Sequence, residues 1–95
     1  MHNINQTTFL SAIQMLNLEQ LHSEISMLNN SIKHLIRSNN DLKEYTQEAW
    51  AEETIKENEQ VIIRQKEKIE MISKEIEKRN ALKDNNTYIL SSKDV

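Results

Sequence analysis

The chain has 95 residues, which is enough for one small domain, and it contains no glycine, proline or cysteine. Aromatic residues make up only 4% of it, so strand-rich folds are disfavoured, because these depend on turn glycines and on aromatic and β-branched side chains. The net charge of −3, with acids and bases interleaved, argues against a nucleic-acid partner, and the lack of cysteine excludes disulfides and thiolate chemistry.

Residues 1–16 form the first segment of the chain. Its apolar spacing predicts a short amphipathic helix that is out of phase with the pattern that follows, on Phe9, Leu10, Ile13 and Leu16. The segment contains no lysine or arginine, and no stretch of the chain approaches the ~20 apolar residues of a membrane span. We therefore expect a soluble protein with no membrane partner, located in the cytoplasm, with the nucleus as an additional compartment.

Residues 17–84 carry the strongest pattern, which starts as apolar positions at alternating spacings of three and four residues. Such spacing is a heptad repeat, and its a and d positions are Leu18, Leu21, Ile25, Leu28, Ile32, Leu35, Asn39 and Leu42. Asn17 and Gln20 resemble a capping box at the start of this helix. The pattern predicts a helix from about residue 18 to about residue 46.

A second heptad series follows, with isoleucine at every a position and mostly polar residues at d. Its members are Ile55, Asn58, Ile62, Gln65, Ile69, Ile72, Ile76 and Arg79. The phase slips between residues 46 and 54, and Thr54 with Glu57 forms a second capping-box pattern. We therefore predict a turn at about 47–53 and a tail at 85–95. Because no glycine or proline interrupts the chain, one continuous helix with a stutter is the alternative.

A chain that folds back near residue 48 aligns residues whose numbers sum to 97, so that Asn39 faces Asn58. A lone buried amide costs about 1–3 kcal/mol, whereas two facing amides satisfy each other and penalise a slipped register. The alternative is that Asn39 is merely hydrated near the tip. The predicted fold is all-α, an antiparallel two-helix coiled-coil hairpin with a short N-terminal helix. Its register and core residues include Asn39, Asn58, Leu28, Leu35, Ile62 and Ile69.

Residues that could carry chemistry are scarce. The three histidines, at positions 2, 22 and 34, have no metal-ligand spacing. No nucleophile sits in a recognisable motif, and a chain without glycine has no phosphate-binding glycine loop. The sequence therefore predicts a protein that is not an enzyme and that uses no cofactor or metal.

Several apolar residues fall outside the a and d positions: Met27, Ile36, Tyr45, Val61, Ile63 and Met71. Singly they are ordinary surface residues, but as a set on a thin rod they indicate a protein-binding surface or an oligomer contact. Trp50, near the tip, is either a partner anchor or a plug over the turn. The predicted partner-binding residues are Ile36, Arg37, Glu59, Val61 and Ile63, with Arg37 at a solvent-facing f position.

Two segments add a more specific pattern, "LEQLHSEISMLNNSIKHLIRSNNDLKEY" and "KENEQVI". Their skeleton joins Glu24-Ile25, Ser31-Ile32, His34-Leu35 and Arg37-Ser38-Asn39 to Glu57-Asn58-Glu59. These segments put polar residues where a generic coiled coil would not. Over about residues 9–77 the chain resembles the fungal translation machinery-associated protein seventeen, also called the ATPase-dedicated chaperone.

The resemblance implies a non-enzymatic chaperone for assembly of the proteasome regulatory-particle base. Such a protein would bind a proteasomal AAA+ ATPase subunit, the sixth of the set, and favour its pairing with the third. We expect it to be a monomer or a weak homo-oligomer. Two alternatives stay open: a prefoldin-like or tubulin-cofactor-like hairpin chaperone for another client, and a structural coiled-coil tether that homodimerises.

Overall fold

Residues 4–94 form three α-helices and one turn of 3₁₀ helix. The structure, a computed structural model, describes the backbone of residues 4–94 and the side chains of residues 7–83. The elements are α1 (Ile4–Gln14), α2 (Leu18–Leu42), the 3₁₀ turn η1 (Lys43–Tyr45) and α3 (Ala49–Asp94). Within residues 4–94 there is no strand, and the prediction of an all-α fold is confirmed.

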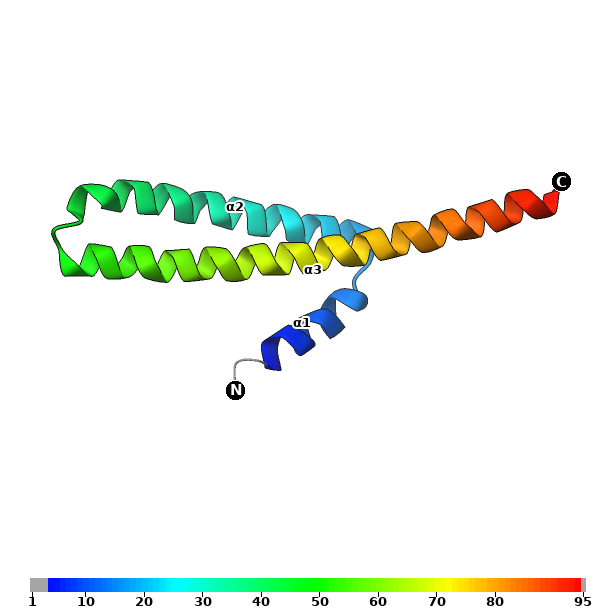
Figure 1. Cartoon of the computed structure of the whole chain (residues 1–95), viewed down its shortest axis with the longest axis horizontal. Coiled ribbons are helices and arrows are strands. Elements are labelled where there is room, and N and C mark those ends of the chain that lie inside the picture. The colour runs from blue at the N-terminus through cyan, green and yellow to red at the C-terminus, as the bar shows by residue number, and fades with distance from the viewer. Residues whose placement is uncertain (1–3, 95) are drawn as a thin grey trace.

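The helices form a thin rod that measures 71 × 29 × 15 Å. α2 and the first part of α3 lie side by side and run in opposite directions, and α3 then continues past the start of α2 (Figure 1). α1 lies against α3 near the middle of the rod, beside the start of α2 (Figure 1). At 1.5 Å per residue, the 46 residues of α3 account for nearly the whole length of the rod.

The start of α2 has the capping box that its sequence predicts. The Asn17 side-chain oxygen accepts from the Gln20 backbone N–H at 2.8 Å, and the Gln20 side-chain oxygen accepts from the Asn17 N–H at 2.9 Å. Two backbone donors that helix geometry would leave without partners are thus satisfied reciprocally. This capping box fixes the point at which the chain leaves α1 and enters α2.

The turn lies at residues 43–48, earlier than the predicted 47–53, because α2 ends at Leu42 and α3 begins at Ala49. Thr54 is not a cap, since it lies inside α3 and its hydroxyl donates to the Trp50 carbonyl at 2.8 Å. α3 instead starts after Glu48, whose carbonyl oxygen accepts a hydrogen bond from the Ala51 N–H at 3.1 Å. Without glycine or proline, no residue marks this turn in the sequence.

The C-terminal end also differs from expectation. The predicted tail at 85–95 requires the second helix to end at about residue 84, but α3 continues through the polar run at 84–86 to Asp94. Asparagine and aspartate cost a helix interior less than about 1 kcal/mol each, so a run without glycine or proline does not break it. The predicted separate tail at 85–95 is therefore wrong for the backbone of 85–94, whose side chains lie outside the described residues.

The best-buried part of the molecule is where three helices meet. Ile13 of α1, Leu21 of α2 and Ile72 of α3 are at most 1% exposed, and Ile76 completes the cluster at 9%. Half-buried apolar residues surround it: Phe9, Leu16, Ile25, Leu28 and Met71. Burying each aliphatic side chain contributes about 1.5–3 kcal/mol, so this cluster anchors α1 and the start of α2 to the middle of α3.

Candidate functional site

A polar layer lies in the contact between α2 and α3 near the tip. The Asn58 side-chain amide donates to the Asn39 side-chain oxygen at 2.8 Å. The Asn39 amide donates in turn to the Ile55 carbonyl oxygen at 3.4 Å, and Asn39 is only 8% exposed. The two amides therefore meet as the alignment of residues summing to 97 predicts, and each fulfils part of the other's hydrogen-bonding capacity.

Most apolar residues of the α2–α3 contact are less well enclosed than Leu21 and Ile72. The predicted core residues Leu28, Leu35, Ile62 and Ile69 are all half-buried, whereas Ile32 is 7% exposed. Two helices alone shield only one stripe of each other, so the seam stays open at its flanks. Within the described residues, one buried polar atom there has no hydrogen-bond partner, the side-chain oxygen of Gln65.

Arg79 of α3 holds the end of α1. Its guanidinium donates to the backbone carbonyls of Leu16 at 2.6 Å, Gln14 at 3.1 Å and Ile13 at 3.2 Å. Glu75, which is 9% exposed, accepts a hydrogen bond from Arg79 Nε at 2.7 Å and thereby orients the planar guanidinium group. A cation at a helix C-terminus satisfies carbonyls that have no intrahelical partner.

We call these contacts of Arg79 with the end of α1 the Arg79 clamp, and the sequence did not predict them. The heptad already placed Arg79 at a d position, and an arginine at a core position is the one signal in the sequence that points to such contacts. The contacts themselves join residues 63 to 66 apart in sequence, so no local pattern announces them. Midway along α1, the Lys68 ammonium lies 5.3 Å from the centre of the Phe9 ring, a cation–π contact.

The five residues predicted to bind a partner do not form one face. Ile36 and Ile63 are 45% and 51% exposed, and Arg37 and Glu59 are exposed as well. Val61 is half-buried. In the heptads, Ile36 is at e and Ile63 at b, which share one side of an antiparallel pair, whereas Val61 at g lies on the other. Ile36 and Ile63 are thus brought to one side, without Val61.

At the tip, the rings of Tyr45 and Trp50 lie 5.9 Å apart between centroids and are tilted by 35°. This arrangement is typical of a favourable aromatic pair, so Trp50 packs on the turn. It nevertheless stays 53% exposed, and Tyr45 50%. The two rings leave substantial apolar surface available at the end of the rod.

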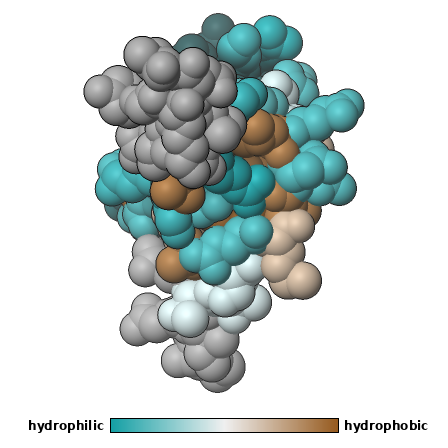
Figure 2. Space-filling model, turned by 90° about the vertical axis from the view of Figure 1, so that its right-hand side faces the viewer, coloured by the Kyte–Doolittle hydropathy of each residue, from teal (hydrophilic) through white to brown (hydrophobic). Residues whose placement is uncertain are grey.

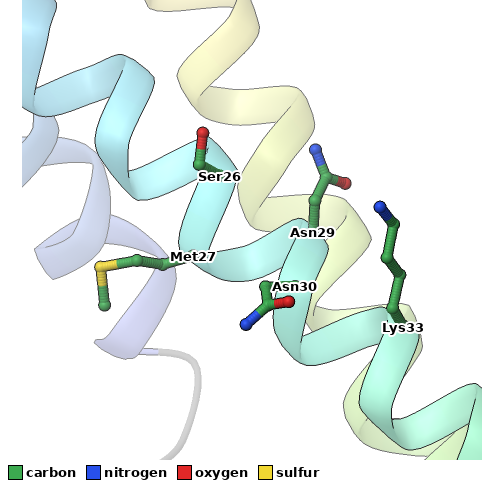
Figure 3. A pocket seen from close by; sticks show the side chains of 5 residues that line it. All are labelled: Ser26, Met27, Asn29, Asn30 and Lys33. Atoms are coloured by element: carbon green, nitrogen blue, oxygen red, sulfur yellow. The ribbon is translucent and has the colours of Figure 1, made fainter.

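The rest of the described surface offers shallow depressions. One lies on α2 alone and is lined by Ser26, Met27, Asn29, Asn30 and Lys33, with Met27 and Lys33 on opposite sides of the helix (Figure 3). Seen end-on, apolar surface is broken into patches between hydrophilic residues (Figure 2). Among residues with described side chains, no three histidine or acidic groups lie together where they could hold a metal.

The comparison with known protein families gives a match that covers most of the chain. Residues 5–83 match the TMA17 helical domain. The chain belongs to the TMA17 family. The match spans α1, α2 and most of α3, so it includes the amide layer and the Arg79 clamp. No curated protein and no solved structure gives a significant match. In the part of the chain that the structure describes, no helix combines the length and apolarity needed to cross a membrane.

Proposed function

We propose that this protein is a non-enzymatic assembly chaperone that binds a proteasomal AAA+ ATPase subunit. It would promote the pairing of that subunit during assembly of the regulatory-particle base. The observation that carries the proposal is membership of the TMA17 family over residues 5–83. The exposed isoleucines Ile36 and Ile63 support it, because apolar anchors ringed by polar residues are the usual layout of a modest interface.

The first experiment asks whether a purified proteasomal ATPase subunit is captured by the full-length protein. The variant Ile36→Ser with Ile63→Ser should weaken capture about tenfold or more, because two exposed anchors are lost. Helicity and melting should stay nearly unchanged, since both side chains are about half exposed.

A matched control changes two apolar residues elsewhere, Met15→Ser with Met27→Ser, which are 87% and 65% exposed. This control should retain capture. If the isoleucine variant also retains it, the interface lies elsewhere, and the segment from Phe9 to Leu16 becomes the next candidate. If the unchanged protein captures no ATPase subunit, the proposed function is wrong.

We further propose that α2 and α3 act as an antiparallel coiled-coil hairpin that is monomeric or only weakly self-associating. The chain has no cysteine, so Leu28→Cys with Ile69→Cys should form a disulfide within one chain at high dilution. Only intermolecular species would contradict the hairpin. Small-angle scattering is a second measure, because one continuous helix over residues 18–94 would be about 115 Å long, against the 71 Å rod.

A further inference from the structure

The two flanks of the α2–α3 pair are not equivalent, because α1 covers one of them. The residues of α3 that meet α1 or its surroundings are Lys68, Met71, Glu75 and Arg79. In the heptad series Lys68 and Glu75 are at g, Met71 at c and Arg79 at d. These positions lie on one side of an antiparallel pair, which we call the α1 side. The opposite side carries the b and e positions of both helices, and we call it the open side.

Two exposed isoleucines mark the centre of the open side. Ile36 of α2 is 45% exposed and Ile63 of α3 is 51% exposed. In the alignment fixed by the Asn39–Asn58 hydrogen bond, Ile63 is level with residue 34, so the two isoleucines lie about 3 Å apart along the rod axis. They therefore form a single small apolar centre that draws on both helices.

Lysines surround this centre. Lys33 and Lys66 lie on its α1-proximal end, and Lys43 and Lys56 lie toward the tip; all four are at b or e positions and are exposed. Lys56 forms an exposed ion pair with Glu52 at 3.6 Å. The other three have no ion pair with any residue whose side chain the structure describes.

Around the two isoleucines the open side is positively charged, although over the full heptads its b and e positions hold four acids, Glu19, Glu59, Glu70 and Glu77, as well as four lysines. We call the position of an α2 residue along the rod its level, and an α3 residue has the level of the α2 residue with which its number sums to 97. Between levels 31 and 43, the b and e positions contain the four lysines and a single acid, Glu59. The chain as a whole has a net charge of −3. A basic rim around an apolar centre complements an acidic, amphipathic partner and repels a basic one.

We infer that the open side binds an acidic amphipathic helix, which packs beside α2 and α3 as a third helix. This inference rests on the proposed function and states which surface and which partner chemistry that function uses. The end covered by α1 shows what a third helix achieves, since Leu21 and Ile72 are fully buried there, while Leu35 and Ile62 are only half-buried. A helix of about three turns would cover the ~18 Å between levels 31 and 43.

A second copy of this chain is a poorer occupant of the same surface. A two-fold symmetric dimer places each patch against its own copy, so the lysine rims would face each other. Like charges in an interface cost several kcal/mol when they are juxtaposed. The chemistry of the open side therefore selects a different, acidic chain.

The test uses the full-length protein and two kinds of partner. The first is the proteasomal ATPase subunit, with a photo-reactive residue in place of Ile36 or Ile63 and, as a control, of Met27 on the other side. The second is a pair of synthetic amphipathic helices of about four heptads, which share Leu and Ile at a and d but have either Glu or Lys at all flanking positions.

The charge-reversal variant is Lys33→Glu with Lys66→Glu, and its matched control is Arg64→Glu with Lys78→Glu, at exposed c positions on the α1 side. We expect cross-links from positions 36 and 63 to an acidic helical segment of the subunit. The acidic peptide should bind and the basic one should not. Affinity for the subunit and for the acidic peptide should fall about tenfold or more in the variant and less than about twofold in the control.

Each outcome decides a separate claim. If the unchanged protein captures no subunit, the proposed function is wrong. The binding of the two peptides then tests the open side by itself. Selective binding of the acidic peptide that is lost in Lys33→Glu with Lys66→Glu supports that surface. The inference is overturned if neither peptide binds, if both bind equally, or if variant and control lose the same affinity. Cross-links to a basic segment, or to another copy of this chain, also overturn it.

Discussion

Both halves of the α2–α3 pair place leucine and isoleucine in the seam, but only the half near the tip adds the amides Asn39, Asn58 and Gln65. Beside α1, Leu21 and Ile72 are fully buried, whereas toward the tip Leu35 and Ile62 are half-buried and Ile32 is 7% exposed. The difference comes from α1, which supplies a third wall at one end only. A helix pair can align a seam, but it needs a third element to remove that seam from water.

The largest expected effect on stability comes from truncating one isoleucine in each half. Ile72→Ala should lower the free energy of unfolding by about 3 kcal/mol, because it leaves a cavity among three helices. Ile62→Ala should cost roughly half of that, since its side chain is already partly hydrated and the site can relax. Urea unfolding followed by circular dichroism measures both, and equal losses would contradict the contrast between the halves.

The next test releases α1 from α3. Arg79→Ala removes three hydrogen bonds to the end of α1 and leaves Glu75 buried without its cation, which should cost about 2 kcal/mol. Hydrogen exchange should rise most in residues 7–14. Arg79→Lys keeps the charge but not the planar fork, so an intermediate effect is expected. Unchanged exchange in α1 would show that the clamp does not hold it.

A smaller effect is expected at the amide layer near the tip. Asn39→Leu alone leaves Asn58 without its partner, so it should gain less stability than a buried leucine normally adds. The double change to leucine should be more stable than either single change, with some loss of a unique register or of the monomeric state. A double-mutant cycle should give a coupling of about 1–2 kcal/mol, and purely additive effects would remove the claimed contact.

The smallest effect concerns the unpaired amide in the same seam. The side-chain oxygen of Gln65 is buried without a hydrogen-bond partner among the described residues, so Gln65→Leu should stabilise the protein by about 1 kcal/mol. The control Gln60→Leu, at an exposed f position, should change the melting temperature little. A loss of stability in Gln65→Leu would show that this amide is satisfied in solution.

Three features were predictable from the sequence: the seam, the amide pair within it and the cap at Asn17. Each rests on short-range spacing or on one alignment between two periodic segments. The position of the turn was not predictable, because the tip lacks glycine and proline and Thr54 imitates a cap from inside α3. The continuation of α3 beyond residue 84 was missed for a related reason, since polar residues alone do not stop a helix.

By itself, the sequence determined which residues share a helical stripe and where the polar residues of that stripe fall, because both follow from a repeat of 3.5 residues. Only the tertiary structure decided which flank of the pair α1 covers. That choice depends on Ile13 reaching Leu21 and Ile72 and on Arg79 reaching carbonyls more than 60 residues away. Such contacts depend on how the whole chain folds back, so the open side with Ile36 and Ile63 becomes visible only once α1 has been placed.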